Sequence, residues 1–122
     1  MIAENNFSEK RKFPRASGNI PVKICQGDGD IVTETVNISR AGAYCKIDRY
    51  IEPMTKLKVS FLLPGLKGSG NIGKKISCEG VVVRVQEIYQ QKAYNLAIFF
   101  NDLNQRDAES ISDYVNAQKE NQ

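Results

Sequence analysis

The sequence contains no histidine and no tryptophan, and the missing histidine narrows the possible functions most. Histidine is the commonest general base in enzymes and a common metal ligand. Its absence means that this protein lacks the usual residue for acid–base catalysis and for many metal sites. Serine or cysteine nucleophiles would have no imidazole to activate them. The sequence therefore predicts a protein that is not an enzyme and that carries neither a metal ion nor a cofactor.

Cysteine and long apolar runs are also scarce. The three cysteines, Cys25, Cys45 and Cys78, are too widely spaced for a zinc ribbon and are odd in number. We interpret them as free thiols of a protein in a reducing cytoplasm. No apolar run approaches the roughly 18 residues that span a membrane, and the first residues lack the apolar stretch of a signal peptide. We therefore expect a cytoplasmic protein without membrane insertion.

The composition is that of one globular domain. The chain has 122 residues, of which 41% are hydrophobic and 25% charged, which is enough to bury a single modest core. Its formal net charge of +3 favours an anionic partner but does not identify one.

Short segments of alternating apolar and polar residues recur along the chain, separated by turn signals. Ile20, Val22 and Ile24 alternate with polar neighbours, and Asp28-Gly29 is a strong signal for a hairpin turn. The same reasoning predicts strands over residues 18–25, 31–38, 43–47, 56–63, 76–88 and 94–100. We therefore predict an all-β fold, a small six-stranded antiparallel β-barrel.

One helix is predicted after the last strand, over residues 104–118. Asn104 is a suitable N-cap, and Asp107 lies three residues later, near the positive end of the helix dipole. A narrow apolar stripe, widened by Tyr114, follows at helical spacing: Ala108, Ile111 and Val115. We expect this stripe to close one end of the barrel.

A glycine-rich segment between two predicted strands resembles a phosphate-binding loop. Residues 68–73 satisfy the pattern G-x-G-x-x-G, but that motif acts through the N-terminus of a helix that follows it. Here residues 76–83 have the composition of a strand. We predict a hairpin loop that takes no part in nucleotide binding.

Two short motifs carry the functional prediction. The first lies in a basic segment, where Arg11 and Arg15 are four residues apart and Pro14 opposes an internal helix. Each guanidinium group can grip a phosphate with two hydrogen bonds or stack on an aromatic base. We interpret this segment as a mobile basic arm.

The second motif follows the second predicted strand. Asn37 and Ser39 are two residues apart, so on a strand they share one face, and Gly42 allows a close approach to the backbone. Taken without the arginines, Asn37 and Ser39 also fit turn chemistry at a strand exit. Together the two motifs describe a receptor for a small, planar, phosphorylated ligand.

This pairing resembles the PilZ domain family, which binds the bacterial second messenger cyclic di-GMP. The family pattern is R-x-x-x-R followed, some twenty to thirty residues later, by [D/N]-x-S-x-x-G. Arg11 and Arg15 match the first half, and Asn37, Ser39 and Gly42 match the second. Lys10 stands where many members carry arginine. The PilZ fold, a six-stranded barrel followed by a helix, agrees with the strands and helix predicted above.

The resemblance implies a non-catalytic receptor for cyclic di-GMP. Arg11 and Arg15, helped by Lys10, would contact the phosphates and stack on guanine. Asn37 and Ser39 would hydrogen-bond the ligand, and Gly42 would leave room for it. The signal would be the ordering of the arm, read by a downstream protein partner. Two alternatives remain. The first is a protein adaptor that needs no ligand. The second is a nucleic-acid-binding barrel, which the lack of exposed aromatic residues for base stacking disfavours.

The expected organisation of the chain follows from these predictions. Residues 1–8 form a disordered tail, and residues 9–118 form the domain. Within the domain we expect the arm at residues 9–17, the barrel at residues 18–100 and the helix at residues 104–118.

Overall fold

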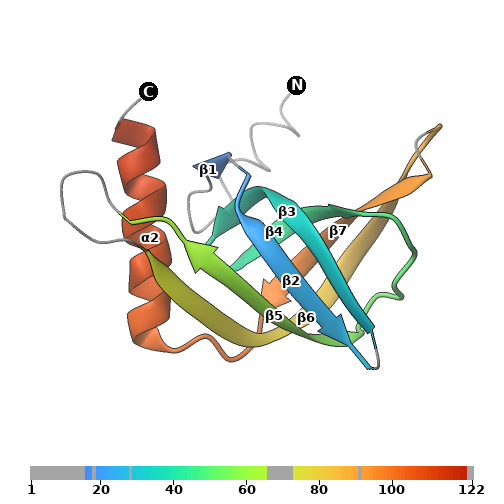
Figure 1. Cartoon of the computed structure of the whole chain (residues 1–122), viewed down its shortest axis with the longest axis horizontal. Coiled ribbons are helices and arrows are strands. Elements are labelled where there is room, and N and C mark those ends of the chain that lie inside the picture. The colour runs from blue at the N-terminus through green and yellow to red at the C-terminus, as the bar shows by residue number, and fades with distance from the viewer. Residues whose placement is uncertain (1–15, 18, 28, 66–72, 91, 121–122) are drawn as a thin grey trace, which may run out of the picture.

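The computed structural model describes residues 16–17, 19–27, 29–65, 73–90 and 92–120. Alternating burial along each strand builds one antiparallel barrel with a helix beside it (Figure 1). The elements, in chain order, are β1 (Ala16–Ser17), β2 (Pro21–Gln26), β3 (Gly29–Ser39), β4 (Gly42–Ile47), β5 (Lys56–Leu63), β6 (Lys74–Ile88), β7 (Ala93–Phe100) and α2 (Gln105–Glu120).

The barrel is closed by the pairing of β3 with β4. The strands follow one another in the order β3, β2, β5, β6, β7 and β4, and every pairing is antiparallel. The predicted six-stranded barrel with one C-terminal helix is therefore confirmed. The short strand β1 pairs with Asn37 and Ile38 of β3. It lies along the same edge of β3 as β2, which pairs with residues 29–34.

The core fills the barrel with inward-facing apolar side chains from every long strand. Its members include residues that are almost completely buried, such as Ile24, Val59, Ile76, Val82 and Leu96. Because side chains alternate along a strand, the residues between these positions face outward, and most of them are polar.

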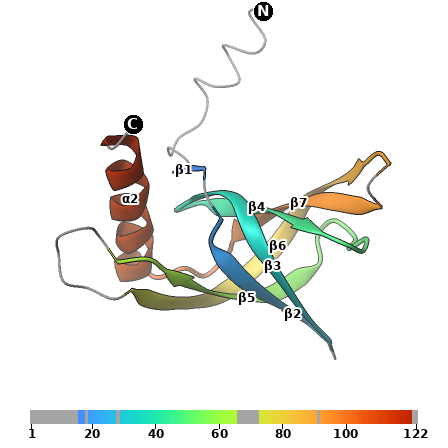
Figure 2. The same ribbon diagram turned by 45° about the horizontal axis from the view of Figure 1, so that its top comes forward.

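Helix α2 closes one end of the barrel with the stripe that the sequence predicts. Ala108, Ile111, Tyr114 and Val115 are all buried, and the last three belong to the core cluster. Figure 2 shows α2 beside the strands, with β1 close to it, and α2 contacts both β1 and β3.

Polar contacts fix the start of α2. The Asn104 side chain accepts a hydrogen bond from the backbone NH of Asp107 at 2.8 Å, which confirms the predicted N-cap. Lys74, the first residue of β6, forms an ion pair with Asp107 at 3.0 Å and donates to the Ser110 hydroxyl at 3.2 Å. The helix is thereby tied to the strand that follows the glycine-rich segment.

The glycine-rich segment lies between two paired strands. Leu63 at the end of β5 faces Lys74 at the start of β6, so a strand and not a helix follows it. Residues 66–72 lie outside the described residues. The absence of a following helix excludes a phosphate-binding loop of the dinucleotide or P-loop kind.

No helix in the described part of the chain is long and apolar enough to cross a membrane.

Candidate functional site at the start of the barrel

The second sequence motif forms a tight hairpin between β3 and β4. Ser39 and Gly42 face each other across a two-residue turn made of Arg40 and Ala41. The Ser39 hydroxyl accepts a hydrogen bond from the Ala41 backbone NH at 3.1 Å. The Ala41 carbonyl accepts another from the backbone NH of Phe100 at 2.9 Å, which joins the turn to β7. The motif therefore first builds a rigid corner of the barrel.

A β-bulge decides which side chains of the motif face outward. The pairing of β3 with β4 shifts register between Thr35 and Asn37. Before the shift, Ile31 and Thr35 point into the core, and after it Ile38 does, with 1% of its surface exposed. Because Ile38 faces the core, Asn37 and Ser39 share the opposite face of β3. The expected common face of these two residues is present, and Asn37 is half-buried on it.

The Ser39 side chain, which is predicted to hydrogen-bond the ligand, is almost completely buried in this structure. It is 1% exposed, and its hydroxyl oxygen already accepts the bond from Ala41. This is the turn chemistry that the sequence also allowed at a strand exit. Its contact with a ligand stays a prediction, and the hydroxyl proton is the donor that it would use.

The fold itself requires glycine at position 42, apart from the predicted need to leave room for a ligand. A Cβ atom placed on Gly42 would collide with the carbonyl oxygen of Ile98 and would lie 3.1 Å from its carbonyl carbon and 3.2 Å from the Phe99 Cα. All three atoms belong to the backbone of β7, which cannot move aside as a side-chain tip can. Glycine at this position is therefore required by the closure of the barrel, whether or not a ligand binds.

The arm residues of the first motif, Lys10, Arg11 and Arg15, lie outside the described residues. The structure does fix the point where the arm leaves the barrel. In β1, Ala16 faces Ile38 and Ser17 faces Asn37. The two residues that directly follow the first motif in sequence therefore lie beside Asn37 and Ile38 at the end of β3.

A row of outward-facing residues that sequence reasoning missed continues from Asn37. Asn37 faces Tyr44, Tyr44 faces Ala97 on β7, and Ala97 faces Arg84 on β6. Ala97 is small and only 8% exposed between its larger neighbours, over a hollow of about 90 Å³ that Tyr44, Arg84 and Asn95 help to line. An aromatic ring, a guanidinium group and a small residue side by side suit a flat, anionic ligand. Only the register of three strand pairs reveals this row.

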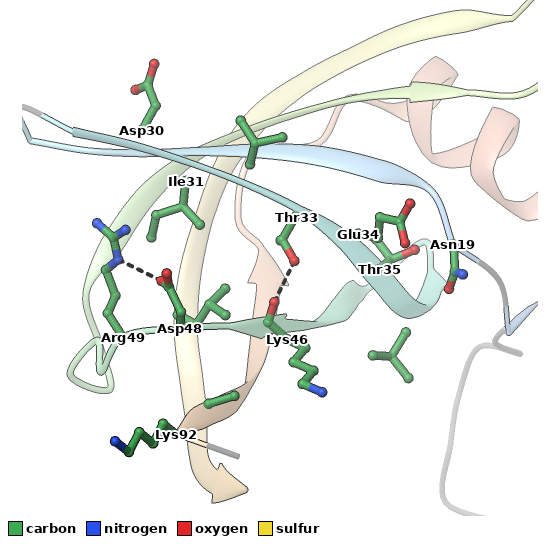
Figure 3. Close-up of a pocket in the computed structure, with 14 residues that line it drawn as sticks. Asn19, Asp30, Ile31, Thr33, Glu34, Thr35, Lys46, Asp48, Arg49 and Lys92 are labelled. Atoms are coloured by element: carbon green, nitrogen blue, oxygen red, sulfur yellow. Dashed lines mark hydrogen bonds and ion pairs between the residues drawn. The ribbon is translucent and has the colours of Figure 1, made fainter.

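A larger hollow, of about 570 Å³, lies between β3 and β4 on the other side of the bulge (Figure 3). The strands separate there, and the Thr33 hydroxyl donates to the Lys46 carbonyl at 2.5 Å. Asp48 and Arg49, which form an ion pair at 3.2 Å, also line it. Its charges have both signs, and neither Asn37, Ser39 nor Gly42 lines it. This hollow is therefore distinct from the motif site.

Two of the three cysteines, Cys45 and Cys78, belong to the core, and Cys25 is partly exposed. Burial raises the pKa of Cys45 to about 12, and burial followed by the charge of Asp102 raises that of Cys78 to about 11. The hydrogen bond with Asp30 is the main cause that raises the pKa of the more exposed Cys25. All three are free, and at neutral pH they stay protonated, which makes them poor nucleophiles. Within the described ranges, no cluster of acidic or cysteine side chains could hold a metal ion.

Comparison with known proteins connects this geometry to a family. The family model described as the PilZ domain matches residues 9–117, which include both motifs and most of α2. No curated protein matches the chain.

Solved structures with the same fold have little sequence in common with this chain. The inhibitor of motility MotI/DgrA of Bacillus subtilis superposes with a TM-score of 0.80 at 18% identity, over 93% of this chain and 52% of that one. The chain thus spans about half the length of that protein. The PilZ domain of YcgR from Escherichia coli, solved with c-di-GMP, has a TM-score of 0.67 at 8% identity. The match covers 92% of this chain and 93% of that one. The PilZ domain of CeSA from a cellulose-synthesising bacterium has a TM-score of 0.58 at 16% identity. The match covers 86% of this chain and 97% of that one.

Proposed function

This chain belongs to the PilZ domain family, a family of cyclic di-GMP receptors, and on that basis we propose that it is itself a non-catalytic receptor for cyclic di-GMP. The observation that supports the proposal best is the pairing of Ala16 and Ser17 with β3. It starts the arginine-bearing arm beside Asn37 and Ser39, so that both halves of the family motif can reach one ligand.

Each residue of the proposed site has a chemical role. Arg11 and Arg15, assisted by Lys10, bind the two phosphates and stack on guanine, because their forks suit both contacts. Asn37 hydrogen-bonds the ligand from the outer face of β3. Ser39 hydrogen-bonds the ligand through its hydroxyl proton, and Gly42 leaves room for the ligand at the corner of the barrel. The row formed by Tyr44, Ala97 and Arg84 continues the same surface toward β6.

The energetics require both arginines. Ordering the backbone of the arm costs roughly 1–2 kcal/mol for each residue. A hydrogen bond to a charged group returns roughly 1.5–3 kcal/mol. One contact therefore cannot order the arm, whereas two phosphates gripped by two forks can. Because β1 already fixes residues 16 and 17, the cost begins only at residue 15.

Titration of the whole chain with cyclic di-GMP tests the proposal directly. We expect saturable binding of cyclic di-GMP and no comparable binding of GTP or of single-stranded RNA, which serve as controls. RNA binding of equal strength would favour the nucleic-acid-binding alternative. No binding of any of the three would favour a protein adaptor, a role consistent with the likeness to an inhibitor of motility.

We further propose that the ligand acts by ordering the arm. Lys10, Arg11, Lys12 and Arg15 repel one another, and a dianionic ligand removes that repulsion. The surface made by arm, nucleotide and barrel would then be what a partner recognises. Hydrogen exchange should show residues 8–15 more protected when the ligand is saturating. Equal protection in both states, with binding verified, would place the switch elsewhere.

A further inference from the structure

The last part of β6 has one edge that no other strand covers in the described part of the chain. β5 pairs with β6 only as far as Val81, whereas β7 pairs with it as far as Ile88. The last backbone contacts on the β5 side join Val82 to the turn before β5. Figures 1 and 2 show β6 and β7 projecting together at the end of the barrel away from α2. We call residues 84–88 of β6 the open edge.

One hydrogen bond shows which backbone groups of the open edge point outward. The backbone NH of Phe100 donates to a carbonyl of the turn between β3 and β4, so Phe100 faces the β4 side of β7. Backbone groups alternate between the two sides of an antiparallel strand, so every second residue from Phe99 back faces β6. Asn95 is one of these residues, and it pairs with Gln86. The NH and carbonyl groups of Val85 and Glu87, on either side of Gln86, therefore point away from β7. Unpaired groups of this kind recruit an added strand.

Exposed apolar side chains stand at both ends of the open edge. At one end, Val83 is 53% exposed, and Met54, whose NH donates to the Val82 carbonyl, is 74% exposed. Met54 adopts a φ of 73°, a conformation that is uncommon for any residue with a Cβ atom. At the other end, Tyr89 is 83% exposed. Apolar groups that gather beside unpaired backbone mark a surface that a protein partner covers.

A second copy of the same edge satisfies the outward-pointing backbone groups. Two identical strands can pair antiparallel about a two-fold axis that passes through one residue. With the axis at Gln86, Val85 of each copy pairs with Glu87 of the other, so every outward-pointing NH and carbonyl group finds a partner. An axis at Glu87 would set two carboxylates against each other. An axis at Val85 would place Glu87 opposite the bulge at Val83.

The axis at Gln86 also makes the two ends of the edge complementary. Val83 and Tyr89 each lie three residues from Gln86, about 10 Å at roughly 3.3 Å per residue. The two-fold rotation therefore brings Tyr89 of one copy to Val83 of the other, near Met54. Aromatic rings pair favourably with β-branched side chains and with methionine. On the axis itself, each Gln86 amide can donate a hydrogen bond to the other.

We propose that this chain forms a two-fold dimer in which the open edges of β6 from two copies pair antiparallel, centred on Gln86. The pairing joins the two barrels through one continuous sheet, because directly opposite side chains lie on the same face. The paired segment is short, so the dimer forms reversibly as the concentration of the chain rises. The pairing uses neither sequence motif and does not depend on the proposed receptor function.

Sedimentation of the whole chain over a range of concentrations tests the pairing. We expect the wild type to pass from monomer to dimer. Glu87→Pro removes an NH that points away from β7, so the barrel keeps its own ladder while the dimer loses one donor from each copy. This variant should associate at least about tenfold more weakly. Glu87→Ala keeps the NH, serves as the matched control and should associate as the wild type does. Circular dichroism verifies the folding of both variants.

A charge test examines the axis and does not use proline. Gln86→Lys and Gln86→Glu each set like charges directly opposite each other, and each should weaken association by at least about threefold. An equimolar mixture of the two should associate more strongly than either variant alone, because lysine of one copy then faces glutamate of the other. A contact in which residue 86 does not face itself would gain nothing from mixing.

Three results would overturn the proposal. They are a wild type that stays monomeric at every concentration, a folded Glu87→Pro variant that dimerises like the wild type, and a mixture that associates no better than its two components. Titration with cyclic di-GMP is a separate measurement. A chain that dimerises in this way and binds no cyclic di-GMP would refute the receptor function and support the pairing of β6.

Discussion

Replacing Gly42 with alanine is expected to lower the free energy of unfolding by about 3 kcal/mol or more. The new methyl group would collide with the backbone of β7 at the Ile98 carbonyl, where Gly42 of β4 is paired with Phe99. Relief requires the two strands to move apart, which disturbs the pairing that keeps the barrel closed. Urea and thermal unfolding of the purified variant measure the effect.

Gly29→Ala is the matched control. Gly29 is the first residue of β3 at a hairpin, as Gly42 is the first residue of β4, but nothing lies within 4 Å of the position of its Cβ atom. We expect its stability to stay within about 1 kcal/mol of the wild type, because alanine there only restricts the unfolded chain. If Gly42→Ala were as stable as Gly29→Ala, the close approach of β4 and β7 would not be a constraint. Any loss of ligand binding in an unfolded Gly42 variant says nothing about the site.

Arg11→Ala and Arg15→Ala are each expected to weaken the binding of cyclic di-GMP by at least about tenfold, or about 1.4 kcal/mol. Each change removes one guanidinium fork from a ligand with two phosphates. The double variant should lose more than either single variant, since neither arginine alone can order the arm. Calorimetric titration measures all three.

Lys75→Ala serves as the control for the loss of positive charge. Lys75 is exposed on β6 and faces Leu62 on β5, away from the Asn37 row. It should bind as the wild type does, and all of these variants should unfold at similar temperatures without ligand, because none removes core packing. Wild-type affinity in both single arginine variants would refute the assignment of the arm.

Local patterns in the sequence were sufficient to predict most elements. Period-two alternation located six strands, and the predicted strand 56–63 has the bounds of β5. The N-cap Asn104 and the buried stripe of α2 also follow from neighbouring residues alone. In each case the physical cause acts within a few residues, so a single segment contains the information.

Features that depend on pairing between distant strands were missed. Residues 16 and 17, counted with the arm, form β1 because the end of β3 offers them a partner. The bulge after Thr35 shifts the alternation of β3, and the row from Tyr44 to Arg84 exists only through register. The sequence indicated a role for Gly42 beside a ligand but not its close approach to the backbone of β7. None of these contacts leaves a local signal.

The two residues of β1 also control how strongly the arm can act at a distance. In the proposed receptor, holding Ala16 against Ile38 shortens the tether between the arm and the ligand site. The effective concentration of Arg15 at a ligand resting on this corner is then set by one peptide bond, and that of Arg11 by five. A tether this short gives values of about millimolar or higher, which fall as the tether lengthens. Freeing β1 from β3 would therefore dilute both arginines without changing any residue that touches the ligand.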